Sequence, residues 1–321
     1  MGQRRRIILT DQKHKILLHF DTDFVEDRRA DFPEVEFISV PRSGEIPAGV
    51  EGEALLTFAW GTENLAEVVK CGVRWIHTIG TGVDRFPMDD IGDCVLTCAR
   101  GASAIPIAEW VLAVMLAFEK RLPESWATKV PERWNMAELG GLHGKTLGLV
   151  GLGSIGEAVA TRAQAFGMRV IACRRTAQPS TLPGVEVVKD LAALLPEADH
   201  LVIAAAATDQ TRKLIDAKAL ARVKPGVHIV NIARGSIVDQ DALEIALDDG
   251  RVACASLDVC EPEPLPEGHW LYRHPRVNLS PHISWSMPDS IAMIRQTFYD
   301  NLRRFLDGEE LQAQVDRTRG Y

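Results

Sequence analysis

The sequence lacks three features that would each point to a particular class of protein. It has no long block of basic residues and its net charge is −8, which leaves little basis for binding nucleic acid through phosphate contacts. It has no CxxC pair, so we expect neither a structural zinc ion nor another metal site. Its longest apolar run, residues 110–118, is too short to cross a bilayer and is interpreted as part of a buried helix.

The cysteines also lack the context of a disulfide-bonded secreted protein. No secretory leader precedes them, so free thiols in a reducing cytoplasm are expected, and membrane and nucleic-acid partners are not. The cysteines are Cys71, Cys94, Cys98, Cys173, Cys254 and Cys260.

What the sequence does contain is the pattern of an α/β protein. With 321 residues, of which 46% are hydrophobic, it is long enough for two domains with cores. Short β-rich runs alternate with helical segments, which is typical of parallel sheets. In the first third the expected strands are residues 15–20, 35–40, 54–59, 73–80 and 94–99, with a helix in 62–72.

A long helix is expected from about Ser103, a plausible N-cap, with Pro106 in its first turn. A second series of strands follows it, and helices are expected at 190–198 and 241–250. The strands of this series are expected within residues 145–153, 169–173, 185–188, 200–207, 227–233, 252–259 and 277–282. The sequence therefore predicts two doubly wound parallel-sheet domains, and a final helix at 290–306 that returns to the first and makes it discontinuous.

A glycine motif opens the second series. Gly151, Gly153 and Gly156 form G-x-G-x-x-G directly after an apolar strand and at the start of a helix, which is the context of a dinucleotide site. The first glycine permits a tight turn, the second lets the backbone approach a pyrophosphate, and the third lets helix and strand pack closely. The helix N-terminus adds unpaired N–H groups that favour a phosphate.

The next strand predicts which dinucleotide is held. It ends at Cys173, where an NAD-selective site usually carries an acidic residue for the ribose hydroxyls. Arg174 and Arg175 follow and can pair with a 2′-phosphate, to which Thr176 can donate a further hydrogen bond. We therefore expect NADP(H) to be preferred, with NAD(H) possible; the alternative is that both arginines only solvate a loop.

Three polar residues stand at expected strand ends, where ligands bind in open α/β sheets. Arg234, Glu263 and His282 follow or lie near successive strands of the second series. Taken singly, they are also compatible with a surface ion pair, a loop carboxylate and a core imidazole.

Taken together, the motifs make the sequence resemble the D-isomer-specific 2-hydroxyacid dehydrogenase family, over most of the chain. The resemblance rests on "TIGTGVD" (78–84), "LHGKTLGLVGLGSIG" (142–156), "VNIARGSIVDQDAL" (230–243), "ASLDVCEPEPLP" (255–266), "NLSPHISW" (278–285) and the helix-start region 97–117. The sequence departs from the common family pattern at Cys98 and Ala206, where Asn and Pro are usual, so the hinge and the adenosine side of the cofactor site are expected to differ in shape.

The resemblance implies a catalytic set. His282 acts as general acid or base on the substrate oxygen, Glu263 holds the other ring nitrogen, and Arg234 pairs with the substrate carboxylate. For the substrate it also implies contacts from Gly80, Thr81, Gly82 and Trp285; Trp60 and Arg85 are further pocket candidates, with packing or a solvated surface as the alternative. For the cofactor it implies Gly151, Gly153, Ser154, Ile155, Gly156, Arg174, Arg175, Thr176, Ala205, Ile232, Ala233, Asp258, His282 and Ser284. For Asp258 the alternative is a cap on the strand end.

The architecture implied by the resemblance is a flavodoxin-like substrate domain and a Rossmann dinucleotide-binding domain. The first comprises residues 1–102 and 289–321, and the second comprises residues 103–288. A homodimer through the dinucleotide-binding domain is implied as well, for which the sequence offers an apolar helix and an arm at 126–142.

The expected activity is cytoplasmic reduction of a small 2-oxo acid, such as glyoxylate or hydroxypyruvate, to a D-2-hydroxy acid. Because the chain ends soon after its last helix, a large feedback-controlled 3-phosphoglycerate dehydrogenase is not expected, whereas a lone-domain version of that enzyme is still compatible with the sequence. Two alternatives stay open: a dinucleotide-sensing protein of the corepressor kind, and a formate or phosphite dehydrogenase on the same scaffold.

Overall fold

The chain folds into two compact units, each built around its own parallel sheet. The structure is a computed structural model that describes residues 13–175 and 178–321. One unit runs to Arg100 and takes in Ile291–Tyr321, and the other comprises Gly101–Ser290. The first unit is therefore discontinuous in sequence.

The sheet of the first unit has five strands, all parallel, in the order β2-β1-β3-β4-β5. This is the flavodoxin-like order, and the order reverses between β1 and β3. The strands are β1 (His14–Leu18), β2 (Val35–Ser39), β3 (Ala54–Thr57), β4 (Trp75–Thr78) and β5 (Val95–Cys98). All five lie within or close to the segments expected from the sequence.

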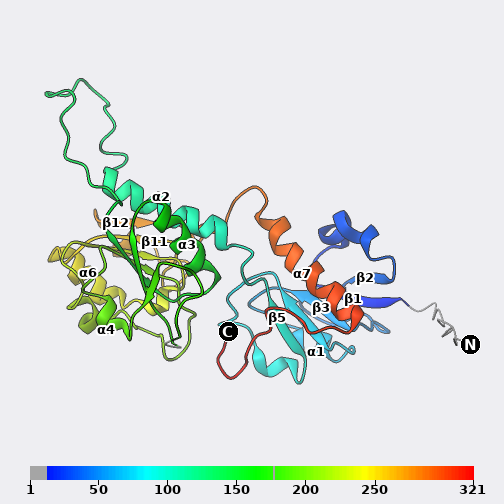
Figure 1. Cartoon of the computed structure of the whole chain (residues 1–321). Coiled ribbons are helices and arrows are strands. Elements are labelled where there is room, and N and C mark those ends of the chain that lie inside the picture. The colour runs from blue at the N-terminus through cyan, green and yellow to red at the C-terminus, as the bar shows by residue number, and fades with distance from the viewer. Residues whose placement is uncertain (1–12, 176–177) are drawn as a thin grey trace, which may run out of the picture. The chain divides into compact units, whose positions relative to one another are not determined.

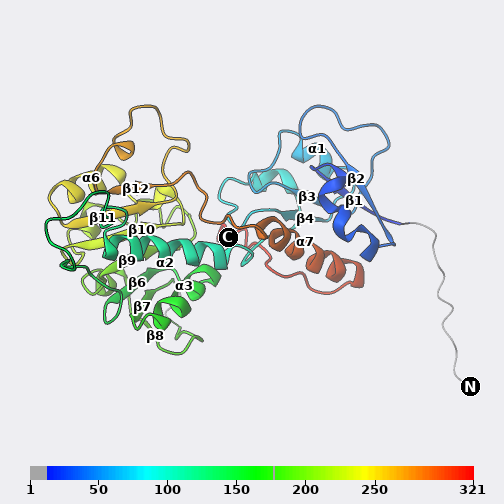
Figure 2. The ribbon, with the colours of Figure 1, turned by 90° about the horizontal axis from the view of Figure 1, so that it is seen from above.

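Helices cover both faces of this sheet because its strands are apolar on both faces. On one face Leu55 and Ile76 pack with Leu65 of α1 (Leu65–Val69). On the other face Leu56 and Trp75 pack with residues of α7 (Ser290–Asp307), which lies along the sheet in Figure 1 and Figure 2. Trp75 stacks on Phe298 with ring centroids 5.7 Å apart, so the C-terminal helix is part of the first core. The 3-10 helices η1 (Thr22–Asp31) and η2 (Met88–Ile91) complete this unit, and neither was predicted.

The sheet of the second unit has seven parallel strands in the order β12-β11-β10-β9-β6-β7-β8. This is a Rossmann order extended by one strand, and it reverses between β6 and β9. The strands are β6 (Thr146–Val150), β7 (Arg169–Cys173), β8 (Val185–Val187), β9 (His200–Ile203), β10 (Val227–Asn231), β11 (Val252–Leu257) and β12 (Val277–Leu279).

The two faces of this sheet are covered by different helices. The helices α2 (Ala104–Lys120) and α3 (Ser154–Ala165) lie side by side on one face, as both views show. The helices α4 (Leu191–Leu194), α5 (Ala217–Leu220) and α6 (Gln240–Asp248) cover the other face. Asp190, Asp216 and Asp239 cap these three helices, each accepting a backbone N–H in the first turn. The 3-10 helices η3 (Gly235–Ile237) and η4 (Trp270–Tyr272) lie in connections between strands.

Two local expectations need correction. Ser103 occupies the position before α2, but its side chain makes no capping hydrogen bond; the residue is buried and its φ of −100° and ψ of 12° are not those of a capping residue. The helix expected at 190–198 is a single turn, because the chain leaves the helix after Leu195 to enter β9.

Candidate active site and dinucleotide site

The glycine motif forms the turn between β6 and α3, at the point where the order of the second sheet reverses. Gly151 has a φ of 102°, and a Cβ there would lie 2.7 Å from the backbone nitrogen of Ala205. A Cβ at Gly156 would lie 2.6 Å from the carbonyl oxygen of Gly151. Both positions therefore need glycine for the turn itself.

Gly153 is different, and its surroundings fit a bound pyrophosphate. Its φ of −107° suits any residue, and a Cβ there would meet no atom within 4 Å. The helix α3 starts at Ser154, and no side chain caps its N-terminus. The N–H groups of Ser154, Ile155 and Gly156 thus border open space at a helix N-terminus, which suits a dinucleotide.

The end of β7 has one of the two features expected of a 2′-phosphate site: its last residue is not acidic, but one of the two arginines that follow bonds to its own loop. Cys173 ends the strand, so no acidic side chain occupies its end. The guanidinium of Arg174 donates to the carbonyl oxygens of Gln178 at 2.8 Å and Pro179 at 3.0 Å, and so holds its own loop. Arg175 is exposed beside it. Thr176 lies outside the described residues.

The remaining predicted cofactor residues of β9 and β10 lie directly after these strands. Ala205 follows β9 near the glycine turn, and Ile232 and Ala233 follow β10. Asn231, which the sequence analysis did not single out, shapes the turn after β10: its amide donates to the carbonyl oxygen of Arg234 at 2.9 Å and accepts from the N–H of Ala233. These residues meet at the carboxyl edge of the second sheet.

The same turn brings two catalytic candidates toward each other. A Cβ at Gly235 would overlap the backbone of Cys260, so only glycine lets the segment after β10 lie against the segment that carries Glu263. Arg234, which precedes this glycine, is half-buried and donates to its neighbour's carbonyl oxygen. Its positive charge lies close enough to Glu263 to lower the pKa of that carboxyl.

Glu263 and His282 form a hydrogen-bonded pair. Nδ1 of His282 donates to Oε2 of Glu263 at 3.1 Å, and Oε1 of Glu263 accepts from the N–H of Cys260 at 3.1 Å. Burial raises the pKa of the Glu263 carboxyl, but these hydrogen bonds and the charges of His282 and Arg234 outweigh burial and hold it below the usual value. The carboxylate therefore favours the tautomer with the proton on Nδ1 and leaves Nε2 of His282 without a bond to Glu263.

The backbone of His282 is held in an unusual conformation by Asp258. His282 has a φ of 55°, in the left-handed region that residues other than glycine seldom adopt. The carbonyl oxygen of Asp258 accepts from the N–H of His282 at 2.9 Å. Its buried carboxylate accepts from the hydroxyl of Ser280 at 2.5 Å and from the N–H groups of Ile283 at 2.8 Å and Ser284 at 2.9 Å. These bonds fit the alternative interpretation of Asp258, in which it stabilises the end of the strand. They also hold the loop that carries His282.

The two residues after Ile283 also lie against this loop. Ser284 is buried, and the indole N–H of Trp285 donates to the carbonyl oxygen of His282 at 3.0 Å. Trp285 packs beside the core cluster that contains Ile107. This hydrogen bond therefore keeps the indole next to the backbone of His282.

In the first unit, the glycine loop 80–82 follows β4. The hydroxyl of Thr81 donates to the carbonyl oxygen of Ala99 at 3.1 Å, and a Cβ at Gly80 would lie 2.7 Å from the Cβ of Ala59. Among the residues that the structure describes, no acceptor takes the N–H groups of Gly80, Thr81 and Gly82. Three unpaired donors at a strand end are suited to a carboxylate.

Metal-binding clusters and membrane-spanning helices are both absent from residues 13–175 and 178–321. These residues hold no group of three or more histidine, cysteine or acidic side chains arranged to bind a metal ion. Their helices are each too short or too polar to cross a membrane.

Known proteins are similar to this chain in sequence and in fold. Residues 112–284 match the family model described as "D-isomer specific 2-hydroxyacid dehydrogenase, NAD binding domain". A D-3-phosphoglycerate dehydrogenase of Methanocaldococcus jannaschii is 31% identical over 291 residues, which cover 88% of this chain and 55% of that protein. A hydroxypyruvate reductase of Thermotoga maritima is 38% identical over 210 residues, which cover 63% of this chain and 68% of that protein.

A solved structure is similar over almost the whole chain. It is a D-isomer-specific 2-hydroxyacid dehydrogenase from Xanthobacter autotrophicus in complex with NADPH and MES, 26% identical, with a TM-score of 0.84 and coverage of 96% of this chain and 100% of that chain. The chain spans about half the length of the first curated relatives that it matches, the phosphoglycerate dehydrogenases. The relatives carry different substrate names, so similarity does not select one substrate.

Proposed function

Because the chain belongs to the D-isomer-specific 2-hydroxyacid dehydrogenase family, we propose that it reduces a small 2-oxo acid, of the glyoxylate or hydroxypyruvate type, to a D-2-hydroxy acid. The observation that carries the proposal is the 3.1 Å hydrogen bond between His282 and Glu263 at the carboxyl edge of the second sheet. It joins a proton donor and an orienting carboxylate in one preformed pair.

The proposed chemistry assigns a role to each charged residue. A bound nicotinamide dinucleotide supplies the hydride. His282 gives a proton from Nε2 to the substrate oxygen, and the lowered pKa of Glu263 keeps its carboxylate ionised to stabilise the imidazolium. Arg234 pairs with the substrate carboxylate through its planar, permanently charged fork.

Further contacts to the substrate come from backbone and aromatic groups. The unpaired N–H groups of Gly80, Thr81 and Gly82 bind the carboxylate of the same substrate. Trp285, held by its bond to the His282 carbonyl, forms part of the wall for the substrate side chain.

NADP(H) is the preferred dinucleotide in this proposal, and NAD(H) is a weaker alternative. The preference rests on Cys173 in place of an acidic residue and on two adjacent arginines. Arg174 and Arg175 together form the proposed 2′-phosphate site, and Arg174 also donates to carbonyl oxygens of its own loop. Gly153 and the start of α3 would hold the pyrophosphate, and the residues that would border the nicotinamide are Ala205, Ile232, Ala233, Asp258 and Ser284.

The arm between α2 and β6 forms the surface of a homodimer in this proposal. It extends away from the body of its unit in Figure 1. Its apolar side chains are strongly exposed, with Trp126 at 67%, Val130 at 91% and Trp134 at 78%. The cytoplasm is the proposed compartment, since all six cysteines are free thiols.

A panel of initial rates tests this function. Purified protein is mixed with NADPH or NADH and with glyoxylate, hydroxypyruvate, phenylpyruvate or 3-phosphohydroxypyruvate, and the loss of nicotinamide absorbance is followed. We expect turnover of an unphosphorylated acid, with kcat/KM about tenfold higher for NADPH, which corresponds to about 1.4 kcal/mol. The Arg175→Gln variant should narrow that ratio while the Arg169→Gln variant, at the other end of the same strand, should keep it.

Three results would revise the proposal at different points. A preference for NADH would remove the 2′-phosphate argument and leave the reaction standing. Turnover of the phosphorylated acid alone would reassign the substrate. Dinucleotide binding without turnover of any acid would favour a dinucleotide-sensing protein.

A further inference from the structure

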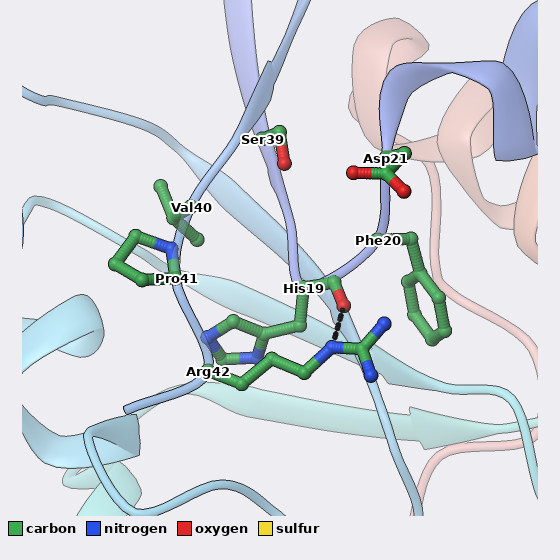
Figure 3. A pocket seen from close by; sticks show the side chains of 7 residues that line it. All are labelled: His19, Phe20, Asp21, Ser39, Val40, Pro41 and Arg42. Atoms are coloured by element: carbon green, nitrogen blue, oxygen red, sulfur yellow. Dashed lines mark hydrogen bonds between the residues drawn. The ribbon is translucent and has the colours of Figure 1, made fainter. Parts of the chain in front are cut away.

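A cavity of about 410 Å³ opens in the first unit, away from the glycine loop 80–82 in sequence. It lies where β1 and β2 end, and Figure 3 shows the side chains around it. His19, Phe20 and Asp21 line it after β1, and Val40, Pro41 and Arg42 line it after β2. The carboxyl ends of parallel strands are where open α/β sheets bind ligands, and β1 borders the point where the strand order reverses.

The guanidinium of Arg42 is held in this cavity by a hydrogen bond from Nε and by contacts of its planar face with two aromatic rings. Its Nε donates to the carbonyl oxygen of His19 at 2.8 Å, the dashed line in Figure 3. Its central carbon lies 4.7 Å from the ring centroid of Phe58 and 5.7 Å from that of Phe20. The two terminal nitrogens donate to no group within the described part of the chain, so the fork that binds a carboxylate is left open.

An aromatic row runs from the cavity along the same edge of the sheet. Phe20 and Phe58 have ring centroids 4.5 Å apart, and Phe58 and Trp60 have ring centroids 5.1 Å apart. Trp60 is 64% exposed, although it stands at a strand end in the middle of the sheet. An exposed indole stacked on a fixed ring is a ready surface for the hydrocarbon part of a ligand.

The polar groups of the wall point to a ligand as well. His19 is 1% exposed, and its Nε2 is a buried polar atom without a partner in residues 13–175 and 178–321. Burial, and after it the charge of Arg42, lowers the pKa of His19 to about 4, so the ring is neutral and adds no second positive charge beside Arg42. Asp21 is the one acidic residue lining the cavity; it makes no ion pair with Arg42 and lies apart from the guanidinium in Figure 3.

We propose that this cavity binds the carboxylate of a small organic acid. The terminal nitrogens of Arg42 take the two carboxylate oxygens, and the carbon chain of the acid packs along Phe20, Phe58 and Trp60. Asp21 lies where it accepts a hydrogen bond from a hydroxyl at the far end of the acid. A planar carboxylate fits because the open edge of the guanidinium is itself planar.

The acid is either the far end of the substrate or a separate molecule. Trp60, the last residue of the aromatic row, follows Ala59, and Ala59 is close to the glycine loop: a Cβ at Gly80 would lie 2.7 Å from the Cβ of Ala59. A longer 2-oxo acid held at Gly80–Gly82 therefore extends along Trp60 toward Arg42. This first source rests on the proposed function, whereas the second does not.

Calorimetric titration of the full chain without dinucleotide tests the site independently of turnover. The probes are succinate and inorganic phosphate, at low ionic strength. We expect succinate to bind in the millimolar range and more tightly than phosphate. Arg42→Gln should weaken succinate binding about tenfold and Arg42→Lys by less, because lysine keeps the charge without the fork. Arg74→Gln, at the amino edge of the same sheet, is the matched control and should bind succinate as the wild type does.

Three results overturn the proposal: no succinate binding by the wild type, equal binding by Arg42→Gln with unchanged circular dichroism, or tighter binding of phosphate than of succinate. Inhibition of turnover by succinate shows whether the bound acid is the far end of the substrate or a separate molecule. Competition with the 2-oxo acid that is lost in Arg42→Gln identifies the far end of the substrate. Non-competitive inhibition lost in the same variant identifies a separate acid. Inhibition unchanged in Arg42→Gln contradicts the site.

Discussion

His282 depends on neighbouring residues for both its orientation and its backbone conformation. Glu263 holds one ring nitrogen at 3.1 Å, and Asp258 holds the loop in which the backbone of His282 adopts a φ of 55°. Such a conformation persists only where surrounding bonds over-determine it. The side chain of His282, the proposed proton donor, is thus positioned by hydrogen bonds to polar groups rather than by packing alone.

Replacing Asp258 should loosen this loop. In the wild type, each carboxylate oxygen of Asp258 accepts a backbone N–H. In Asp258→Asn, one of these oxygens is replaced by an NH₂ group, so one backbone N–H loses its acceptor. We expect a loss of about 2 kcal/mol in the free energy of unfolding, measured with urea. Ser280→Ala removes a single bond to the same carboxylate and should cost about 1 kcal/mol. Equal stability of Asp258→Asn and the wild type would mean that these bonds do not hold the loop.

The Glu263 carboxylate should make stability depend on pH in the acid range. Its pKa in the folded chain is lowered from 4.5, so its stabilising effect is fully present above that value and is lost as the pH falls through the folded pKa. The difference in unfolding free energy between wild type and Glu263→Gln should therefore shrink as the pH falls below 4.5. A difference that grows on acidification would contradict the pair.

At the scale of elements, the β6–α3 turn separates the requirements of the fold from those of the ligand. Gly151 and Gly156 are needed for the turn, because a Cβ at either would meet backbone atoms. Gly153 is not, because a Cβ there would meet nothing within 4 Å. The glycine pattern thus contains one position whose constraint comes from a bound group.

Two alanine variants test this separation. Gly151→Ala should lower the unfolding free energy by about 2 kcal/mol, since it combines a φ of 102° with a backbone contact. Gly153→Ala should leave stability within about 0.5 kcal/mol and weaken NADPH binding about tenfold, because its methyl group occupies the phosphate position. Thermal unfolding and fluorescence titration measure both quantities. Unchanged NADPH affinity in Gly153→Ala would remove this turn from the dinucleotide site.

Elements were predictable where a local pattern alone defines them. Most strands are short apolar runs because both of their faces are buried, and the fold class followed from their alternation with helices. The 3-10 helix at Thr22–Asp31 was missed because Val25 is its only buried residue, which leaves no periodic apolar pattern. The cavity at Arg42 was missed for a similar reason: its parts come from two strand ends that become neighbours only when β1 pairs with β2.

The candidate site shows the same limit at single residues. The order of Arg234, Glu263 and His282 along the chain was sufficient to select them, and the structure brings Glu263 and His282 together. The anchoring role of Asp258 was only an alternative, because its partners lie 22 to 26 residues ahead and depend on the register between β11 and β12. The bonds of Arg174 to Gln178 and Pro179 depend on how its loop turns back, which residue types alone do not reveal.

At the scale of the whole molecule, the two units should respond differently to the dinucleotide. All proposed dinucleotide contacts lie in Gly101–Ser290. At a free NADPH concentration of about 100 times Kd, binding to the folded state alone adds about 2.7 kcal/mol to the unfolding free energy of the second unit, and of any segment that unfolds together with it. Hydrogen exchange should therefore slow about 100-fold in β6, β9 and β10 and much less in β1, β3 and β4.

The Gly153→Ala variant is the control for this experiment, since it should show the slowing only at higher NADPH concentration. Equal slowing in both sheets would mean that the chain unfolds as one cooperative block. Slowing confined to the first sheet would contradict the assignment of the dinucleotide to the second unit.

The most direct test of the central claim is the configuration and rate of the product formed from hydroxypyruvate and NADPH. Chiral chromatography of the glycerate should give the D-isomer for the wild type. His282→Ala should form it about 10³-fold more slowly at saturating NADPH, because general acid–base assistance is lost while the glycine turn that binds the dinucleotide is intact. Formation of the L-isomer, or an undiminished rate in His282→Ala, would contradict the account.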